Sequence, residues 1–167
     1  MGYKKHMKTR STDENAPDAF TDAVKNTPEI CLGLRIGLQA LKNDAGRVKA
    51  TDNRKLNGSV DIDETTKNLY PEASRWDYVI GYEGKAYFLE VHSTNTSDID
   101  DMLKKADWLR QWLNTKAPEL EAISGSKCFY WISPGAYNIV SSSPQARKLA
   151  QSKVKYMGKV FQLPHKP

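Results

Sequence analysis

The stretch RWDYVIGYEGKAYFLEVH, residues 75–92, has the pattern of a β-hairpin and decides the expected fold. Two apolar and aromatic runs flank the dipeptide Glu83-Gly84, which is a strong turn signal. If those two residues form the loop, counting back along both strands sets Asp77 directly opposite Glu90. A three-residue loop would instead shift the register by one residue and separate the two carboxylates.

With the two-residue loop, Asp77, Glu90 and His92 share one face of the sheet. The Cβ atoms of directly opposed residues lie only about 4.5–5.5 Å apart, and residues two apart on a strand also share a face. Two like charges in this position destabilise a sheet, so a bound divalent cation would explain them. Carboxylates at strand ends can also simply be solvated. Both strands are apolar on both faces, which favours a sheet that is covered on both sides.

Composition indicates a single folded domain outside the membrane. The chain has 167 residues, of which 39% are hydrophobic and 27% are charged, and it contains no apolar run of about 18 residues. Its first residues are basic and lack the apolar core of a secretion signal. Cys31 and Cys128 lie in apolar segments without metal-ligand spacing, so we expect buried free thiols and a cytoplasmic location. The net charge of +5 favours a polyanionic partner.

Hydrophobic periodicity and turn signals predict the order of elements along the chain. Residues 1–17 are expected to be a disordered tail. The remaining elements are a helix at 27–43, a short strand at 59–63, the hairpin, a helix at 97–113, a strand at 127–133, a helix at 143–157 and a strand at 159–163. This order predicts one α/β domain over residues 18–167, with a mixed central β-sheet flanked by helices on both sides.

The hairpin motif, set in an α-β-β-β-α-β order, resembles the PD-(D/E)xK, or restriction-endonuclease-like, nuclease superfamily. In this chain the motif is Trp76-Asp77, then 12 residues, then Glu90-Val91-His92. The resemblance covers roughly residues 27–133 and implies a restriction-endonuclease-like fold.

The resemblance also implies a catalytic role for each matching position. Asp77 and Glu90 would ligate Mg²⁺ or Mn²⁺, with the backbone carbonyl of Val91 nearby. Hard oxygen ligands suit these ions, which lower the pKa of a bound water and hold the scissile phosphate. The implied activity is that of a metal-dependent endonuclease that hydrolyses phosphodiester bonds, with DNA as the expected substrate.

The motif departs from the family at His92, where the family usually has lysine. A histidine could act as a general base or as a neutral metal ligand, or it could be structural. Trp76 also replaces the proline of the motif, at a position that is not a ligand. Lys105 is a second candidate for the missing charge, because it lies on the flank of the apolar stripe of the following helix. The alternative for Lys105 is a solvated surface lysine.

Several polar and basic residues are candidates for contacts with nucleic acid. Ser93 and Thr94 directly follow the motif and could bind phosphate oxygens, although a plain loop and helix cap would also explain them. Arg147, Lys148 and Lys155 lie on the predicted basic helix, and we expect them to contact the phosphate backbone.

Further candidates are weaker. Trp108 and Trp112 lie away from the apolar stripe of their helix and could stack on bases or form a homodimer or other protein interface. Glu29 is a candidate outer metal ligand, and Asp61 and Asp63 are expected mainly on the exposed face of an edge strand.

Two alternatives to a nuclease remain open at the level of sequence. One is a nuclease-like nucleic-acid or protein-binding module without catalysis, which the altered position His92 and the tryptophans favour. The other is a structural α/β protein whose carboxylates are incidental. Fold alone does not distinguish among these functions.

Overall fold

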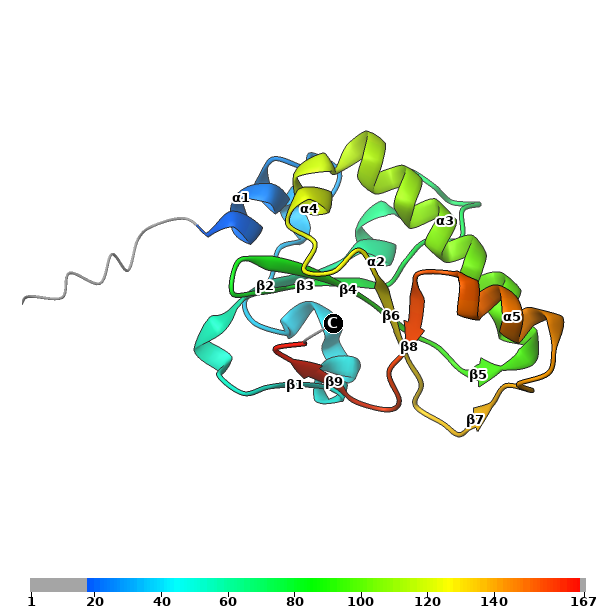
Figure 1. The fold of residues 1–167 in the computed structure, drawn as a ribbon. Coiled ribbons are helices and arrows are strands. Elements are labelled where there is room, and N and C mark those ends of the chain that lie inside the picture. The colour runs from blue at the N-terminus through cyan, green and yellow to red at the C-terminus, as the bar shows by residue number, and fades with distance from the viewer. Residues whose placement is uncertain (1–17, 166–167) are drawn as a thin grey trace, which may run out of the picture.

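The computed structural model describes residues 18–165, which form one mixed α/β domain around a five-stranded sheet (Figure 1). The strand order is β2-β3-β4-β6-β8, in which β2, β3 and β4 are antiparallel neighbours and β4, β6 and β8 run parallel. The predicted mixed sheet is confirmed. Its strands are β2 (Leu56–Asp61), β3 (Tyr78–Tyr82), β4 (Lys85–Val91), β6 (Phe129–Ile132) and β8 (Val154–Tyr156). The predicted tail, residues 1–17, lies outside the described part of the chain.

The β3–β4 hairpin closes through a two-residue loop, as predicted. Tyr82 pairs with Lys85, and the loop residues Glu83 and Gly84 have φ values of 49° and 76°. Positive φ at both central residues gives a turn whose twist matches that of the two strands, and glycine adopts it without steric cost. The hairpin register is therefore set by local turn chemistry.

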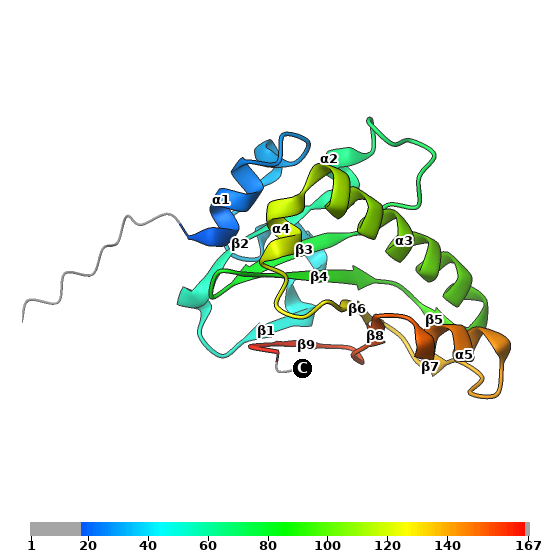
Figure 2. The same ribbon diagram turned by 45° about the horizontal axis from the view of Figure 1, so that its top comes forward.

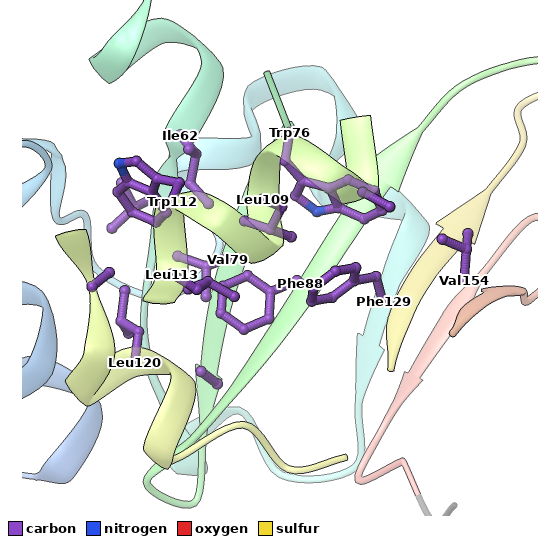
Figure 3. Close-up of a cluster of buried hydrophobic side chains, with 14 of the residues drawn as sticks. Ile62, Trp76, Val79, Phe88, Leu109, Trp112, Leu113, Leu120, Phe129 and Val154 are labelled. Atoms are coloured by element: carbon purple, nitrogen blue, oxygen red, sulfur yellow. The ribbon is translucent and has the colours of Figure 1, made fainter. Parts of the chain in front are cut away.

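Helices cover one face of the sheet (Figure 2). They are α1 (Ala19–Lys25), α3 (Ile99–Lys116), α4 (Pro118–Ala122) and α5 (Pro144–Gln151), while the short α2 (Ile62–Thr66) follows β2. The apolar stripe of α3 packs onto the sheet through residues at helical spacing, namely Ile99, Met102, Ala106, Leu109 and Leu113. Beneath this helix, the buried rings of Trp76, Phe88 and Phe129 lie side by side (Figure 3).

The opposite face has a different cover. Here β1 (Val48–Ala50) pairs in parallel with β9 (Phe161–Leu163), and the 3-10 segment η2 (Gln39–Arg47) precedes β1. A second buried cluster joins these segments to the sheet through aromatic and aliphatic side chains, including Ile80, Tyr87, Leu89, Tyr130 and Phe161. The sheet is thus covered on both sides, but by α-helices on one side and by a 3-10 segment and a β-ribbon on the other.

The predicted first helix, residues 27–43, is wrong. The structure has α1 earlier in the chain, then the short 3-10 turn η1 (Cys31–Gly33), an extended Leu34 and later η2. Arg35 instead forms a β-bridge with Ser59 of β2, with N–O distances of 2.9 and 3.0 Å in the two directions. This pairing satisfies the backbone in an extended conformation, so the apolar spacing that suggested a helix reflects contacts with the core.

The C-terminal part of the chain also differs in detail from the prediction. The helix that begins after Ser143 ends at Gln151, and β8 follows where the helix was expected to continue. Two strands of two residues, β5 (Thr94–Asn95) and β7 (Tyr137–Asn138), pair in parallel beyond the ends of β4 and β6, and the 3-10 turns η3 (Asn53–Lys55) and η4 (Thr96–Asp98) precede β2 and α3. Cys31 and Cys128 are free, as predicted, but half-buried. No helix within residues 18–165 has the length and apolar character needed to cross a bilayer.

Candidate active site

Asp77 and Glu90 meet at the open end of the β3–β4 hairpin. The last registered pair is Tyr78 with Leu89, so the next position sets Asp77 opposite Glu90. The backbone N–H of Asp77 donates to Glu90 Oε2 at 2.9 Å, and the N–H of Val91 donates to Asp77 Oδ2 at 3.1 Å. Each carboxylate is thus bonded to the strand that carries the other, which confirms that the two side chains are adjacent.

Both carboxylates lie on the face of the sheet that α3 covers. Glu90 is opposite Trp131 of β6, a member of the buried cluster beneath the helices. Its side chain is fully buried at 0% exposure, whereas the side chain of Asp77 is 22% exposed. The site therefore has a dry inner carboxylate and an outer one that solvent can reach.

Lys105 of α3 reaches into this pair. Its ammonium contacts Glu90 Oε1 and lies 3.8 Å from Asp77 Oδ1. From the flank of α3, the long side chain of Lys105 reaches Asp77 and Glu90 at the open end of the β3–β4 hairpin, in the interior of the sheet. Lys105 is thus an ion-pair partner of both carboxylates, and the alternative of a solvated surface lysine is wrong.

The electrostatics of the cluster follow from burial and from the charges that face one another. Burial and the Asp77 carboxylate raise the pKa of Glu90 to about 8, against the opposing effect of Lys105. Burial also raises the pKa of Asp77, while Lys105 and the Val91 N–H act to lower it. Burial disfavours the Lys105 ammonium, but the two carboxylates outweigh this effect and raise its pKa. The lysine thus stays charged at neutral pH, while Glu90 holds its proton in the fold until the pH approaches 8.

We expect the melting temperature to fall as the pH rises from about 5 to about 8. In this range Glu90 is ionised in the unfolded chain, with an ordinary pKa of 4.5, but holds its proton in the fold, where the pKa is about 8. A proton bound more tightly by the folded state stabilises it, and that contribution is lost as the pH passes the folded pKa. Thermal denaturation across this range should show the slope, and Glu90→Gln should flatten it. An equal slope in the variant would assign the titration to another group.

His92 follows the last residue of β4 and has other neighbours. Its backbone N–H donates to Ile132 O at 3.0 Å, which extends the pairing of β4 with β6. The ring Nδ1 lies 3.0 Å from the carbonyl oxygen of Ser93, and the His92 carbonyl accepts a bond from the Trp131 indole. Within residues 18–165, the hydrogen bonds of the ring are thus with Ser93, and the cation that reaches the carboxylates is Lys105.

Two further carboxylates, on α2 and at its N-terminus, are held by local partners. Asp61 accepts the backbone N–H of Glu64 at 2.9 Å and caps α2, and Asp63 pairs with Arg75 at 2.9 Å. Asp63 lies in the first turn of α2 and not on the edge strand where it was expected. Both charges still act to raise the pKa of Asp77, so they add negative potential beside the pair.

A metal at this site would have few protein ligands. In the described part of the chain, no group of three or more His, Cys, Asp or Glu side chains is placed to hold a metal ion. The donors that the structure brings together are the carboxylates of Asp77 and Glu90. Mg²⁺ is typically held by one or two carboxylates with water and substrate phosphate, so this donor set fits that ion.

The predicted roles of Glu29 and Trp112 change in the structure. Trp112 is only 3% exposed, and its indole N–H donates to Glu29 at 2.8 Å, while the Tyr70 hydroxyl donates to the same carboxylate at 2.9 Å. Trp112 is seven residues beyond Lys105, about 10 Å along α3, so Glu29 lies with these aromatic groups. The expected exposure of Trp112 is wrong, because the segments of Glu29 and Tyr70 cover it. Trp108 is half-buried and stacks on Trp112 with ring centroids 5.8 Å apart.

The three basic residues predicted to contact phosphate do not share one surface. Arg147 and Lys148 are exposed on α5, which packs near the start of α3, where Lys148 lies 3.6 Å from Asp100. Lys155 is opposite Tyr130 in the sheet, and Tyr130 belongs to the cluster on the other face. Opposed residues share a face, so Lys155 points away from the α5 side.

The two predicted phosphate contacts in the loop after the motif differ in exposure. Ser93 is exposed, and its hydroxyl donates to Asp98 at 2.9 Å. The Thr94 hydroxyl instead donates to the Ala136 carbonyl, and Thr94 is 1% exposed, so it is directed into the fold. Asn95 and Asp98 form a capping box before α3, which supports the alternative of a plain helix cap for this loop.

Comparison of the chain with known proteins identified no relative. No family model matches it, and the searches of curated proteins and of solved structures found no significant match. Function is therefore inferred from the fold and the site themselves.

Proposed function

We propose that this protein is a metal-dependent nuclease with a restriction-endonuclease-like fold that hydrolyses phosphodiester bonds, with DNA as the substrate. The observation that carries the proposal is the convergence of Asp77, Glu90 and Lys105 on one face of the β3–β4 hairpin. With the short elements β1, α2, β5 and α4 set aside, the order α1, β2, β3, β4, α3, β6 follows the α-β-β-β-α-β arrangement that the motif implies. A divalent cation bound between the two carboxylates would take the place of the proton that Glu90 holds in its absence.

Each residue of the site has a definable part in the reaction. Asp77 and Glu90, with the Val91 carbonyl, would hold Mg²⁺ or Mn²⁺. The bound ion would lower the pKa of a coordinated water and neutralise charge on the scissile phosphate. Lys105 keeps its proton because its pKa is raised, so it acts as a cation and hydrogen-bond donor and not as a base. The ammonium would donate to the phosphate oxygens as negative charge develops there.

The buried environment of Glu90 strengthens these interactions. A fully buried carboxylate has a fixed direction, because the Asp77 N–H holds Oε2 and the Lys105 ammonium holds Oε1. Electrostatic interactions are stronger in such a dry site than in water. Asp77, which is partly exposed, provides the side from which water and a phosphate can enter.

One observation favours a second candidate, a nucleic-acid-binding module without cleavage. The Lys105 ammonium already contacts both carboxylates, and a proton on Glu90 would compensate the remaining charge without a metal. The basic positions on α5 would then provide binding alone.

Incubation of the purified protein with plasmid, single-stranded DNA and RNA tests the two candidates. Each substrate is combined with Mg²⁺, Mn²⁺ or EDTA, beside an Asp77→Ala control. Cleavage that needs metal and is lost in the control supports the nuclease. Binding without cleavage under every metal supports the second candidate.

Affinity for DNA is expected to depend on α5. Each phosphate contact contributes about 0.9 to the slope of log K against log salt, so charge reversal at Arg147 and Lys148 should reduce the slope by about 1.8. Arg147→Glu alone should reduce the slope by about 0.9, and Lys155→Glu is its matched control, because this lysine lies on the other face of the sheet. Binding titrations in EDTA at several salt concentrations provide the measurement. If Lys155→Glu reduces the salt slope more than the α5 substitutions do, the DNA binds on that other face of the sheet.

A further inference from the structure

A cavity of about 290 Å³ lies between α3, α4 and the N-terminal ends of β6 and β8. Three basic side chains line it from three separate segments: Arg110 of α3, Lys127 before β6 and Lys153 before β8. Leu113 and Phe129 provide apolar walls, and Glu121 is the one acidic residue of the lining. None of these residues belongs to the carboxylate cluster, so the cavity is a second site.

The charges around this cavity are not balanced. Three cations against one carboxylate leave the lining with a net charge of +2. Arg110 pairs with Asp107 outside the lining at 3.1 Å, but the two side chains are 40% and 71% exposed, so solvent screens the pair. Lys127 and Lys153 are exposed and have no salt-bridge partner within residues 18–165. An anion bound between them would relieve their mutual repulsion.

The arginine is held in position before any ligand arrives. Its guanidinium lies over the ring of Phe129, 5.2 Å from the centroid. That ring is fixed in turn by Trp76 and Phe88, with centroid distances of 5.4 and 5.8 Å (Figure 3). The bond to Asp107 uses Nη1, which leaves Nε and Nη2 as donors. Two such donors in a rigid plane match two oxygens of a tetrahedral anion.

We propose that this cavity binds a phosphate monoester. A monoester carries a charge of about −1.5 to −2 at neutral pH, which matches the net charge of the lining, whereas an internal phosphodiester carries only one negative charge. The volume is near the lower limit of about 300–1,000 Å³ for small-molecule sites, so the cavity has room for the phosphoryl group and an adjoining part of the ester. Two sources provide this chemistry: a free small phosphate ester and the terminal phosphate of a nucleic acid.

The first experiment uses adenosine 5′-monophosphate as the probe and adenosine as its uncharged control. The wild type should bind the monophosphate in calorimetry and should not bind adenosine. The double variant Lys127→Gln/Lys153→Gln should bind the monophosphate about tenfold or more weakly than the wild type, because two charge-assisted contacts are lost. Lys104→Gln with Lys159→Gln is the matched control. Both lysines are exposed and lie outside the cavity, so the two substitutions remove the same net charge without changing its lining.

The second experiment separates the two sources and leaves the carboxylate site out of the readout. Oligonucleotides with a 5′-phosphate or a 5′-hydroxyl are titrated in EDTA. A preference for the phosphorylated end that the Lys127/Lys153 variant loses assigns the cavity to nucleic-acid ends. Monophosphate binding without such a preference assigns it to a free ester. The proposal is overturned if the wild type binds no monophosphate, if adenosine binds equally well, or if the cavity and control variants bind the monophosphate alike.

Discussion

Glu90→Gln is expected to reduce metal-dependent DNA cleavage by roughly two to three orders of magnitude, if the proposed nuclease activity holds. The amide has the volume of the acid and can still accept the Asp77 N–H, but it provides no negative charge for a cation. The fold should tolerate it, because an uncharged group at this fully buried position resembles the protonated acid. Nicking of supercoiled plasmid with Mg²⁺ or Mn²⁺ measures the loss.

The same variant should lose its response to metal in a thermal melt. A cation that binds only the folded state raises the melting temperature of the wild type, and Asp77→Asn should abolish this shift as Glu90→Gln does. Glu72→Gln is the matched control, because Glu72 is exposed and outside the site. If both site variants cleave DNA like the wild type and show the same metal-induced rise in melting temperature, these carboxylates are not the metal ligands.

Lys105→Met should lower cleavage by about two orders of magnitude or more and should exceed the effect of His92→Ala. The ammonium contacts both carboxylates, whereas the His92 ring bonds to Ser93. Lys104→Met on the same helix is the matched control, because Lys104 is exposed. Single-turnover cleavage by the four proteins, with metal in excess, provides the comparison.

Lys105→Met should also destabilise the fold in a pH-dependent way. Removal of one partner of a buried ion pair costs up to about 3–5 kcal/mol, and the partial exposure of Lys105 places this case toward the lower end. The cost should be greatest above about pH 8, where Glu90 is ionised, and smaller in acid, where its proton replaces the lysine. Unfolding by denaturant at two pH values measures the difference. A loss that is equal at both values would point to packing of the lysine stem.

The two possible roles of His92 predict different pH dependences of cleavage. If it acts as a base, cleavage should rise with pH through the titration of the imidazole, and His92→Ala should remove that limb while metal affinity is kept. If it provides only charge, His92→Lys should be active and less dependent on pH. Should His92→Ala and Lys105→Met both cleave like the wild type, neither residue is catalytic. Should the wild type cleave nothing with any metal, the binding module becomes the better account.

The hairpin shows how far local sequence determines this protein. Glu83-Gly84 specifies a two-residue turn, and strict alternation along both strands then places Asp77 beside Glu90. The apolar stripe of the 97–113 helix and the strand at 127–133 were also predicted, because each depends on a periodicity within one short segment. These features need no knowledge of distant contacts.

Other features depend on which distant segments meet. Residues 27–43 have helical spacing, yet Arg35 pairs with Ser59 and the helix does not form. Trp112 lies off the apolar stripe of α3, but Glu29 and Tyr70 cover it, and their polar atoms satisfy one another. Sequence periodicity identifies the face of an element without identifying the segment that will pack against it.

The two proposed sites differ in the same way. The carboxylate pair could be predicted from the sequence as one of two registers, because both members belong to one hairpin, and the structure has the two-residue loop that brings them together. The position of Lys105 beside the pair, and the gathering of Arg110, Lys127 and Lys153 around one cavity, depend on contacts between distant segments and could not be predicted from local patterns. The docking of α3 on the sheet sets both, since a long side chain on the flank of a helix reaches a partner or reaches water according to how the helix packs.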